Sequence, residues 1–317
     1  MNGIYSELKE LIQLRLKARK LNIFRNTVPK SQLAGGSLSS YKGRGIDFDE
    51  VRAYQPGDDI RTIDWRVTAR RSKPHTKVFR EERERPVLII LDQSHSLFFG
   101  SQLNFKSVTA CEIAAMLSWA TLYHGDRIGG VIFNEKSLCN IRPKHSKTAL
   151  IHFLQKAEEL NNQLHLSAAP SQAPTGYFSK ALRHARRVAH PGTQIFIISD
   201  FKDLNDDATQ LMAQLRRHCE IIAFQISDPL EQELPKPDTY VVTNGVHRYT
   251  LDSRKRNHRQ QFRDYQQAQT KKIQRRLREY RIPLTQISSG KETVPQLLLR
   301  FSAKRPSSHL GSLKSEI

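Results

Sequence analysis

The stretch that decides the fold is residues 86–96, which read Pro86-Val87-Leu88-Ile89-Ile90-Leu91-Asp92-Gln93-Ser94-His95-Ser96. A short aliphatic run between a proline and an aspartate predicts a β-strand buried on both faces. Strands of this kind occur in parallel sheets that are covered by helices on either side. The polar residues from Asp92 onward would then lie at the carboxyl end of a buried strand.

The same pattern recurs along the chain, with helical segments between the apolar runs. Strands are predicted at Pro86–Asp92, Arg127–Phe133, Gln194–Asp200 and Glu220–Ile226. Helices are predicted at Val108–Tyr123, Thr148–Leu160, Phe178–Val188 and Ala208–Arg217. This alternation predicts an α/β fold, with a mostly parallel, Rossmann-like sheet and helices on both faces.

The flanking segments have other patterns. A broad apolar stripe predicts a helix over residues 3–22, and the Ser/Gly-rich stretch 31–45 is typical of a loop. Asn244-Gly245 indicates a hairpin, and a long basic helix is predicted over 256–281. We therefore predict three parts: an N-terminal helix with a smaller basic module (1–85), the α/β domain (86–301), and a flexible tail (302–317).

Charge is distributed unevenly over the 317 residues, whose 51 Lys+Arg and 31 Asp+Glu give a net charge of +20. Residues 1–85 carry +8, residues 86–252 are neutral, and residues 253–317 carry +12. Two basic arms around a neutral middle suggest binding to nucleic acid or to an anionic surface. The alternative is that these side chains only solvate helix faces, and no zinc-finger or RNP pattern decides between the two.

Several protein classes are disfavoured by the composition. The longest aliphatic run, 87–91, is too short to cross a bilayer, and no apolar signal-peptide region is visible near the N-terminus. Three widely spaced cysteines form neither a disulfide framework nor a CxxC zinc pattern. We therefore expect a cytoplasmic protein.

Two strand-terminal aspartates carry the candidate chemistry. Asp92 and Asp200 each close an apolar strand, and Ser94 and Ser96 follow the first of them. Ligands of open parallel sheets bind beyond the carboxyl ends of the strands. An all-oxygen set of this kind suits a hard cation such as Mg²⁺. The alternative is that Asp92 and Ser94 only cap the next turn.

A catalytic role is less well supported. An aspartyl phosphotransferase of the haloacid dehalogenase type needs a second carboxylate two positions after Asp92, where this chain has Ser94. Neighbouring Ser94 and His95 would point apart on an extended segment. The chain has neither a P-loop nor a dinucleotide-binding glycine motif. We predict that the protein is not an enzyme, and a metal-dependent phosphohydrolase is the weaker alternative.

A second distinctive block spans residues 48–65, where Pro56-Gly57-Asp58 indicates a turn and charges of opposite sign alternate. If ion pairs surround a buried Trp65, the block is a structural scaffold. If the block is exposed, it is a docking face for a partner protein. The sequence leaves both interpretations open. The candidate partner-binding residues are Arg52, Tyr54, Asp58, Asp59, Arg61, Asp64 and Trp65.

The pattern Asp92-x-Ser94-x-Ser96 with a late strand-terminal Asp200 resembles the metal-ion-dependent adhesion site of von Willebrand factor A domains. The resemblance implies a divalent cation, Mg²⁺ or a similar ion, that is completed by an acidic residue of a bound partner. It also implies a threonine ligand ahead of Asp200. Thr175 is the candidate, although it lies about one residue out of the usual frame.

Over roughly residues 5–301 the chain is also similar to the bacterial domain of unknown function 58 family. The residues that carry this similarity are Tyr54-Gln55-Pro56-Gly57-Asp58-Asp59, Asp64-Trp65, Gly125-Asp126-Arg127, Ser199-Asp200-Phe201 and Asp228-Pro229-Leu230-Glu231. The resemblance implies a von Willebrand factor A-like domain and a partner ATPase of the MoxR-type AAA+ class. We therefore expect a Mg²⁺-dependent adaptor or cofactor of such an ATPase in protein maturation or stress-related assembly.

Overall fold

The computed structural model describes residues 3–23, 46–55, 60–71, 73–81, 84–165, 175–243 and 248–302. The chain divides into two compact units. Unit 1 comprises Met1–Asn26 together with Arg85–Ile317, and unit 2 comprises Thr27–Glu84. Each unit is described by itself below.

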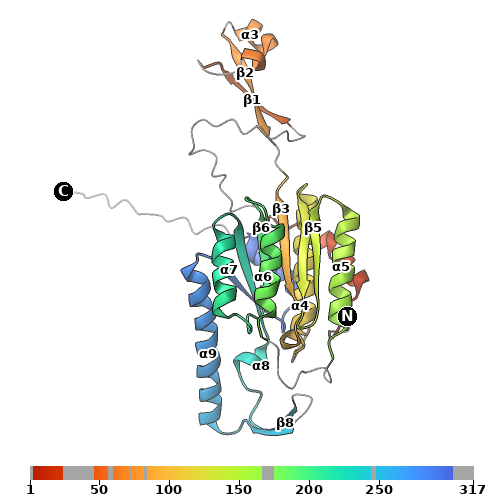
Figure 1. Cartoon of the computed structure of the whole chain (residues 1–317), viewed down its shortest axis with the longest axis vertical. Helices are drawn as coiled ribbons and strands as arrows, with labels where there is room; N and C mark the ends of the chain where they lie inside the picture. Colours follow the sequence, from red (N-terminus) through yellow and green to blue (C-terminus); the bar gives the residue numbers. More distant parts are fainter. Residues whose placement is uncertain are drawn as a thin grey trace, which may run out of the picture. The chain divides into compact units, whose positions relative to one another are not determined.

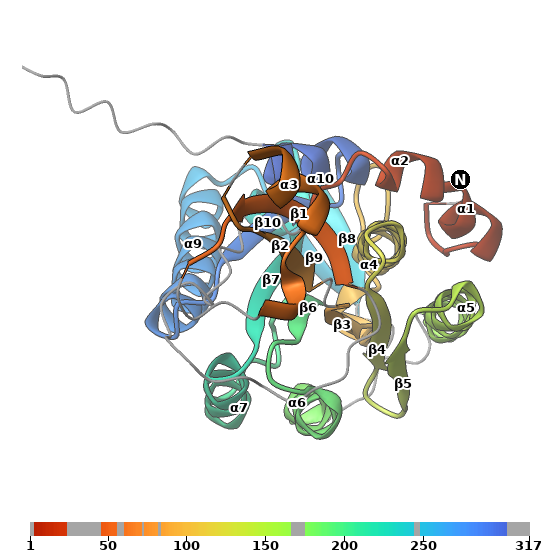
Figure 2. The same cartoon turned by 90° about the horizontal axis from the view of Figure 1, so that it is seen from above.

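Unit 1 (Figure 1) is built on a six-stranded sheet. The strands lie in the order β10-β7-β6-β3-β4-β5, which can be followed in Figure 2. Its strands are β3 (Pro86–Asp92), β4 (Arg127–Phe133), β5 (Leu138–Lys144), β6 (Gln194–Ser199), β7 (Glu220–Ser227) and β10 (Leu284–Ser288). All neighbouring strands pair in parallel except β5, which runs antiparallel to β4. The predicted α/β fold class with a mostly parallel sheet is confirmed.

Helices cover both faces of this sheet, as Figure 2 shows. One face packs against α4 (Lys106–Tyr123), α5 (Lys147–Asn162) and α10 (Thr293–Ser302). The other packs against α6 (Tyr177–Val188), α7 (Asp206–Arg216) and α9 (Arg256–Glu279). Two apolar clusters result, one on each face, because alternate residues of a strand point to opposite sides. Ile89 and Leu91 enter the first cluster, and Leu88 and Ile90 enter the second.

The sheet contains two strands that the sequence patterns did not reveal. β5 alternates polar and apolar residues at one edge, and β10 occupies the other edge after α9. Edge strands are half-solvated, so they lack the continuous apolar run that marks the central strands. Helix α10 also lies where no helix was predicted.

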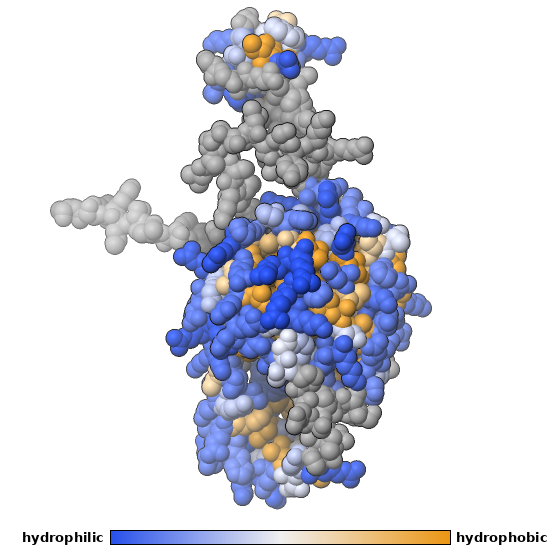
Figure 3. Space-filling view, viewed as in Figure 1, coloured by the Kyte–Doolittle hydropathy of each residue, from blue (hydrophilic) through white to orange (hydrophobic). Residues whose placement is uncertain are grey.

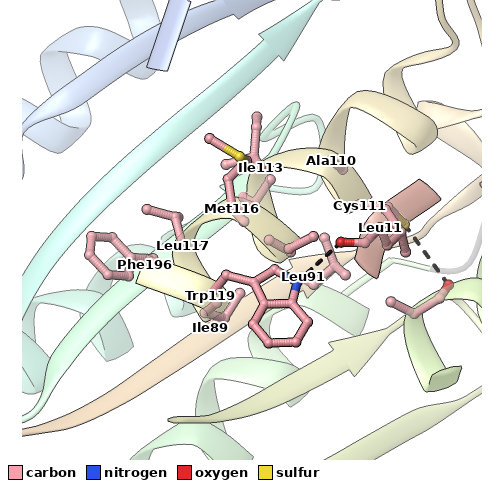
Figure 4. Close-up of a cluster of buried hydrophobic side chains, with 14 of the residues drawn as sticks. Leu11, Ile89, Leu91, Ala110, Cys111, Ile113, Met116, Leu117, Trp119 and Phe196 are labelled. Carbon is pink, nitrogen blue, oxygen red and sulfur yellow. Dashed lines mark hydrogen bonds between the residues drawn. The ribbon is translucent and has the colours of Figure 1, made fainter. Parts of the chain in front are cut away.

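The N-terminal segment belongs to unit 1. The predicted helix over residues 3–22 is wrong in detail, because the chain forms two short helices, α1 (Leu8–Gln13) and α2 (Arg15–Ala18). Leu11 and Leu14 are buried against α4, and Trp119 Nε1 donates to the Leu11 carbonyl at 3.1 Å (Figure 4). The apolar stripe was thus correctly placed, but it is covered by the α/β unit.

This packing moves the domain boundary. The predicted N-terminal part (1–85) combined the first helix with the basic module, whereas the structure groups residues 1–26 with 85–317. The Ser6 amide donates to Asn161 Oδ1 at 2.7 Å and the Leu8 amide to Glu158 Oε1 at 2.7 Å, so side chains of α5 bond the start of the chain. Ser302, the first residue of the predicted tail (302–317), is the last residue of helix α10 (Thr293–Ser302). The rest of that tail and the predicted loop 31–45 lie outside the described residues.

Unit 2 contains an antiparallel pair of strands, β1 (Ile46–Ala53) and β2 (His75–Glu81). Between them lie a 3-10 helix, η2 (Ile60–Thr62), and helix α3 (Trp65–Arg71). The Asp64 amide donates to the His75 carbonyl at 2.8 Å, which joins the start of α3 to the pair of strands.

The remaining elements of unit 1 lie between β7 and β10. They are α8 (Pro229–Gln232), the predicted hairpin of β8 (Thr239–Thr243) and β9 (Arg248–Asp252), and α9. The face of unit 1 that carries α6 shows many hydrophilic side chains (Figure 3), which agrees with the exposure of Lys180, Arg183, Arg186 and Arg187 on that helix. Among the described helices, none is long and apolar enough to span a membrane.

Candidate metal-binding site

The carboxyl ends of β3 and β6 form the centre of the candidate site. These strands are neighbours in the sheet, yet the chain leaves β3 toward β4 on its other side. A reversal of strand order of this kind opens a crevice at the carboxyl ends of the two strands. Asp92 is the last residue of β3, and Asp200 follows directly after β6. The two strand-terminal aspartates predicted from the sequence therefore lie together at the carboxyl ends of two neighbouring central strands.

The Asp92–Ser96 loop gathers three of the predicted metal ligands. Asp92 is 2% exposed and Ser94 is fully buried. The Ser94 amide donates to Asp92 Oδ1 at 2.8 Å, and the hydroxyls of Ser94 and Ser96 are 3.1 Å apart. The hydrogen bond from the Ser94 amide to Asp92 is the contact expected if Asp92 caps the following turn, which was the alternative to metal binding. This contact uses the Ser94 amide and not the serine hydroxyls, so it does not exclude a role of the hydroxyls as ligands.

Asp92 is a buried carboxylate without an ion-pair partner among the residues that the structure describes. Its second oxygen, Oδ2, accepts a hydrogen bond from Ser199 Oγ at 2.6 Å. Burial and then the neighbouring charge of Asp200 raise the pKa of the Asp92 carboxyl to about 7, against the bonds from Ser199 and Ser94 that favour its ionised form. The Asp92 carboxyl is therefore about half protonated at neutral pH, because its ionised form is poorly compensated.

Asp200, in contrast, is already neutralised by a lysine. Lys106 is the first residue of α4, its side chain is fully buried, and its Nζ lies 2.9 Å from Asp200 Oδ2. Burial opposes ionisation of Asp200, but the ammonium groups of Lys106 and Lys202 outweigh it and lower the pKa of the carboxyl. Burial likewise disfavours the charged form of Lys106, yet the two carboxylates around it raise its pKa.

The second carboxylate on Lys106 is Glu231, whose Oε1 lies 2.7 Å from Nζ. Glu231 belongs to α8, where its Oε2 also accepts from the Asp228 amide in a capping box. Lys202 Nζ reaches the same Glu231 Oε1 at 2.7 Å from the solvent side. The Asp228-Pro229-Leu230-Glu231 motif therefore ends in a buried ion-pair network at the candidate site.

Thr175 does not join this cluster. It is exposed, just ahead of α6, and the amides of Gly176 and Phe178 at the start of that helix donate to Asp203 instead. The first residue of α6 is Tyr177, whose hydroxyl lies near Ser94 and Asp92. Burial, followed by the charge of Asp92, raises the pKa of Tyr177. Tyr177 rather than Thr175 thus lies near Ser94, whereas the resemblance implied a threonine ligand.

The donor set fits a divalent cation in part. Asp92, Ser94 and Ser96 offer hard oxygen ligands of the type that Mg²⁺ prefers, and the uncompensated carboxylate favours a cation. Asp200 is paired with Lys106. Thr175 is exposed and forms no hydrogen bond with the cluster in the described part of the chain. No three His, Cys, Asp or Glu side chains of the described residues form a metal-ligating group, so a bound ion would depend on the serine hydroxyls.

The candidate partner-binding residues all belong to unit 2. Two of them, Asp58 and Asp59, lie outside the described residues. Asp64 Oδ1 accepts from the amides of Arg66 and Val67 and so caps α3. Arg52 and Tyr54 are half-buried near the end of β1, and Arg61 is exposed. Trp65 is 69% exposed, which rules out a scaffold built around a buried tryptophan.

Four residues of the site were not singled out in the sequence: Lys106, Tyr177, Ser199 and Glu231. Ser199 and Glu231 stood in motifs whose role was unknown. Lys106 carried no such signal, because the predicted helix began at Val108, whereas α4 begins at Lys106. Its pairing with Glu231 spans 125 positions in sequence, so only the fold brings the two together.

Comparisons with known proteins connect this arrangement to a family. Residues 50–273 match the family described as "Protein of unknown function DUF58". An uncharacterised protein of Mycobacterium tuberculosis is 28% identical over 280 residues, which cover 86% of this chain and 84% of that protein. The uncharacterised protein YeaD of Bacillus subtilis is 37% identical over 67 residues, which cover 21% of this chain and 16% of YeaD.

Two solved structures align with the chain at low similarity. The conserved hypothetical protein BatB from Bacteroides thetaiotaomicron is 15% identical, with a TM-score of 0.36, and the alignment covers 62% of this chain and 98% of that one. The SpRpn10 VWA domain is 12% identical, with a TM-score of 0.33, covering 69% and 95%. Because the family match spans most of the chain and includes Asp92, Lys106 and Asp200, the protein belongs to the DUF58 family, whose function is unknown.

Proposed function

We propose that the protein is a non-catalytic, Mg²⁺-dependent protein-interaction module, in which Asp92, Ser94 and Ser96 hold the ion. The observation that carries the proposal is the buried Asp92 carboxylate, which has two serine hydroxyls beside it and no ion-pair partner among the described residues. A buried anion of this kind is costly unless a cation compensates it. Mg²⁺ would supply that charge and take up the hydroxyl oxygens.

The charge balance of the site favours an acidic partner. Asp200 and Glu231 pair with Lys106 and Lys202, whereas Asp92 pairs with neither lysine. These three carboxylates therefore exceed the two ammonium groups by one negative charge when all five groups are ionised. A divalent cation turns this excess of one negative charge into an excess of one positive charge. A carboxylate from a partner protein would restore neutrality and complete the coordination of the ion.

The partner that the family resemblance implies is a MoxR-type AAA+ ATPase, for which this chain would act as adaptor or cofactor. Unit 2 supports a docking role of its own, since Trp65 and Ile60 are 69% and 66% exposed. Exposed large apolar side chains of this kind are common at protein interfaces. We therefore propose that the metal site of unit 1 and the exposed face of unit 2 both contact the partner.

Isothermal titration calorimetry with MgCl₂ tests the ion. The full chain should bind Mg²⁺, Asp92→Ala should abolish binding, and Thr175→Ala should bind as the unchanged protein does, because Thr175 is exposed and outside the cluster. Circular dichroism and thermal melting of both variants confirm that they are folded. Absent binding in the unchanged protein, or unaltered binding in Asp92→Ala, would refute the metal-dependent module.

Affinity capture tests the partner. The tagged chain is incubated with nuclease-treated lysate of a DUF58-containing bacterium in Mg²⁺ and in EDTA, and bound proteins are identified by mass spectrometry. We expect an AAA+ ATPase that is retained in Mg²⁺, lost in EDTA, and lost with Asp92→Ala. Capture that is indifferent to EDTA would contradict the role of the metal, even if the same ATPase were found.

A further inference from the structure

The edge strand β10 has an exposed side that the fold leaves incompletely paired. It lies at the end of the sheet, and β7 is its only strand neighbour among the described residues. In a parallel pair, alternate residues direct their amide and carbonyl groups to the neighbouring strand. The Pro283 carbonyl accepts from the Ala223 amide, and the Ser289 amide donates to the Ser227 carbonyl. The backbone groups of the odd-numbered residues of β10 therefore pair with β7. The backbone amide and carbonyl groups of the even-numbered residues Leu284, Gln286 and Ser288 point away from β7, toward the open edge of the sheet.

One of the three outward positions is satisfied by a side chain. Gln296 of α10 accepts from the Ser288 amide at 2.9 Å and donates to the Ser288 carbonyl at 3.0 Å. A glutamine amide here takes the place of a neighbouring strand. The backbone groups of Leu284 and Gln286 have no hydrogen-bond partner in the part of the chain that the structure describes. Two consecutive outward positions are thus open for pairing.

Space is available beside this open edge. A cavity of 520 Å³ is lined by β10 residues Leu284 and Gln286 and by α9 residues Gln274 and Arg278. A second cavity of 440 Å³ also includes Gln286 and continues along α9 toward Asp200 and Lys202. Helix α9 forms a wall of both cavities, and Figure 1 shows it along the outer side of unit 1. Exposed edges are usually blocked by charge, bulges or covering loops, whereas here a hollow remains.

The α9 side of the hollow is basic. The second cavity is also lined by Asp200 and Glu231, whose carboxylates are paired with Lys106 and Lys202. Helix α9 carries eight Lys or Arg and two Asp or Glu residues. Arg278 and Arg281 line the first cavity, Lys272 lines the second, and all three side chains are exposed. None of the three forms an ion pair with a carboxylate of the described residues. The chain's own residues 303–317 carry three basic residues and one acidic residue, so they do not complement this charge.

We propose that the free edge of β10 binds an extended acidic segment of a partner protein as an additional strand. The backbone of the segment would pair with Leu284 and Gln286, in the manner of peptides that extend a sheet. Its acidic side chains would face Arg278, Arg281 and Lys272. This interaction needs no metal ion, so it is independent of the proposed Mg²⁺ site.

Fluorescence anisotropy with a labelled heptapeptide of alternating Glu and Val, in EDTA, tests the proposal on the full chain. The matched probe alternates Lys and Val. Gln286→Pro removes the central amide donor, and prolines are tolerated on edge strands, so the variant should fold. Gln286→Val keeps the amide and serves as its control. The double variant Arg278→Glu/Arg281→Glu tests the charge, and circular dichroism verifies the fold of each variant.

We expect saturable binding of the acidic peptide and none of the basic one. Gln286→Pro should weaken binding about tenfold, as the loss of a backbone hydrogen bond and steric blocking imply, while Gln286→Val should not. The double arginine variant should weaken it at least as much. Absent binding of the acidic peptide, equal affinity of Gln286→Pro and Gln286→Val, or preference for a labelled DNA duplex over the peptide would overturn the proposal.

Discussion

Replacing Asp92 by asparagine should make the ion-free protein more stable, and increasingly so as the pH rises. The substitution keeps the shape of the side chain and an oxygen that can accept from the Ser94 amide. It removes the negative charge that burial and Asp200 disfavour. A site built for a cation is expected to behave in this way, since its anion is a cost until the cation arrives.

The sign of the pH dependence of stability follows from comparing proton binding by Asp92 in the folded and unfolded states. The pKa of the Asp92 carboxyl is about 7 in the folded chain, and its ordinary value is 3.8. Between these values the folded state binds more protons than the unfolded state, so the stability of the unchanged protein falls as the pH rises. The fall is complete above about pH 7, where both states are ionised.

The magnitude follows from the same two values. Their difference corresponds to a penalty of about 4 kcal/mol at high pH. Less than half of this penalty is already present near pH 5, so the advantage of asparagine should grow by roughly 2–3 kcal/mol between about pH 5 and about pH 8. The new amide also changes the bond to Ser199, which costs about 1 kcal/mol but contributes equally at both pH values. The difference between the two pH values is therefore the quantity to measure.

This difference can be measured by urea unfolding in EDTA at the two pH values, monitored by tryptophan fluorescence. The chain has two tryptophans, Trp65 in unit 2 and the buried Trp119 in unit 1. A Trp65→Phe background restricts the signal to unit 1. A stability difference between Asp92→Asn and the parent that is the same at both pH values, or that shrinks as the pH rises, would refute the account of a buried uncompensated anion. Added Mg²⁺ should stabilise the parent and leave Asp92→Asn unchanged.

Two further predictions concern the surroundings of the site. Lys106→Met should destabilise the protein by about 3–5 kcal/mol near neutral pH in urea unfolding, because it leaves the buried Asp200 carboxylate uncompensated. The matched variant is Lys202→Met, which should cost less than about 1 kcal/mol because the Lys202 side chain is 54% exposed. Equal losses of stability in the two variants would contradict a special role for Lys106. Leu11→Ala should lower the unfolding free energy of unit 1 by about 2–5 kcal/mol, since Leu11 is buried against α4 and only 2% exposed. The control Leu16→Ala, at a position that is 64% exposed, should change this free energy by less than about 0.5 kcal/mol. A negligible effect of Leu11→Ala would show that the N-terminal helices are not part of the core of unit 1.

The central strands could be predicted from the sequence because their surroundings are uniform. β3 is buried on both sides, so its apolar run needs no information about its neighbours. β10 was missed because it is only half-buried, and its pattern Leu284-Thr285-Gln286-Ile287-Ser288 alternates weakly. The break between α1 and α2 was missed for a related reason, since Leu11, Leu14 and Ala18 are buried at spacings that a single continuous helix would also satisfy.

The sequence by itself determined the α/β fold class and the loop in which Asp92, Ser94 and Ser96 lie together. Both depend on local information, namely an apolar run and the residues that directly follow it. Only the tertiary structure decided the charge state of the site. Lys106, Asp200 and Glu231 come from three segments far apart in the chain, and the order of the strands determines which carboxylate receives the lysine. Asp92 remains the uncompensated anion because burial and ion pairing depend on distances in space, which no local pattern of residues encodes.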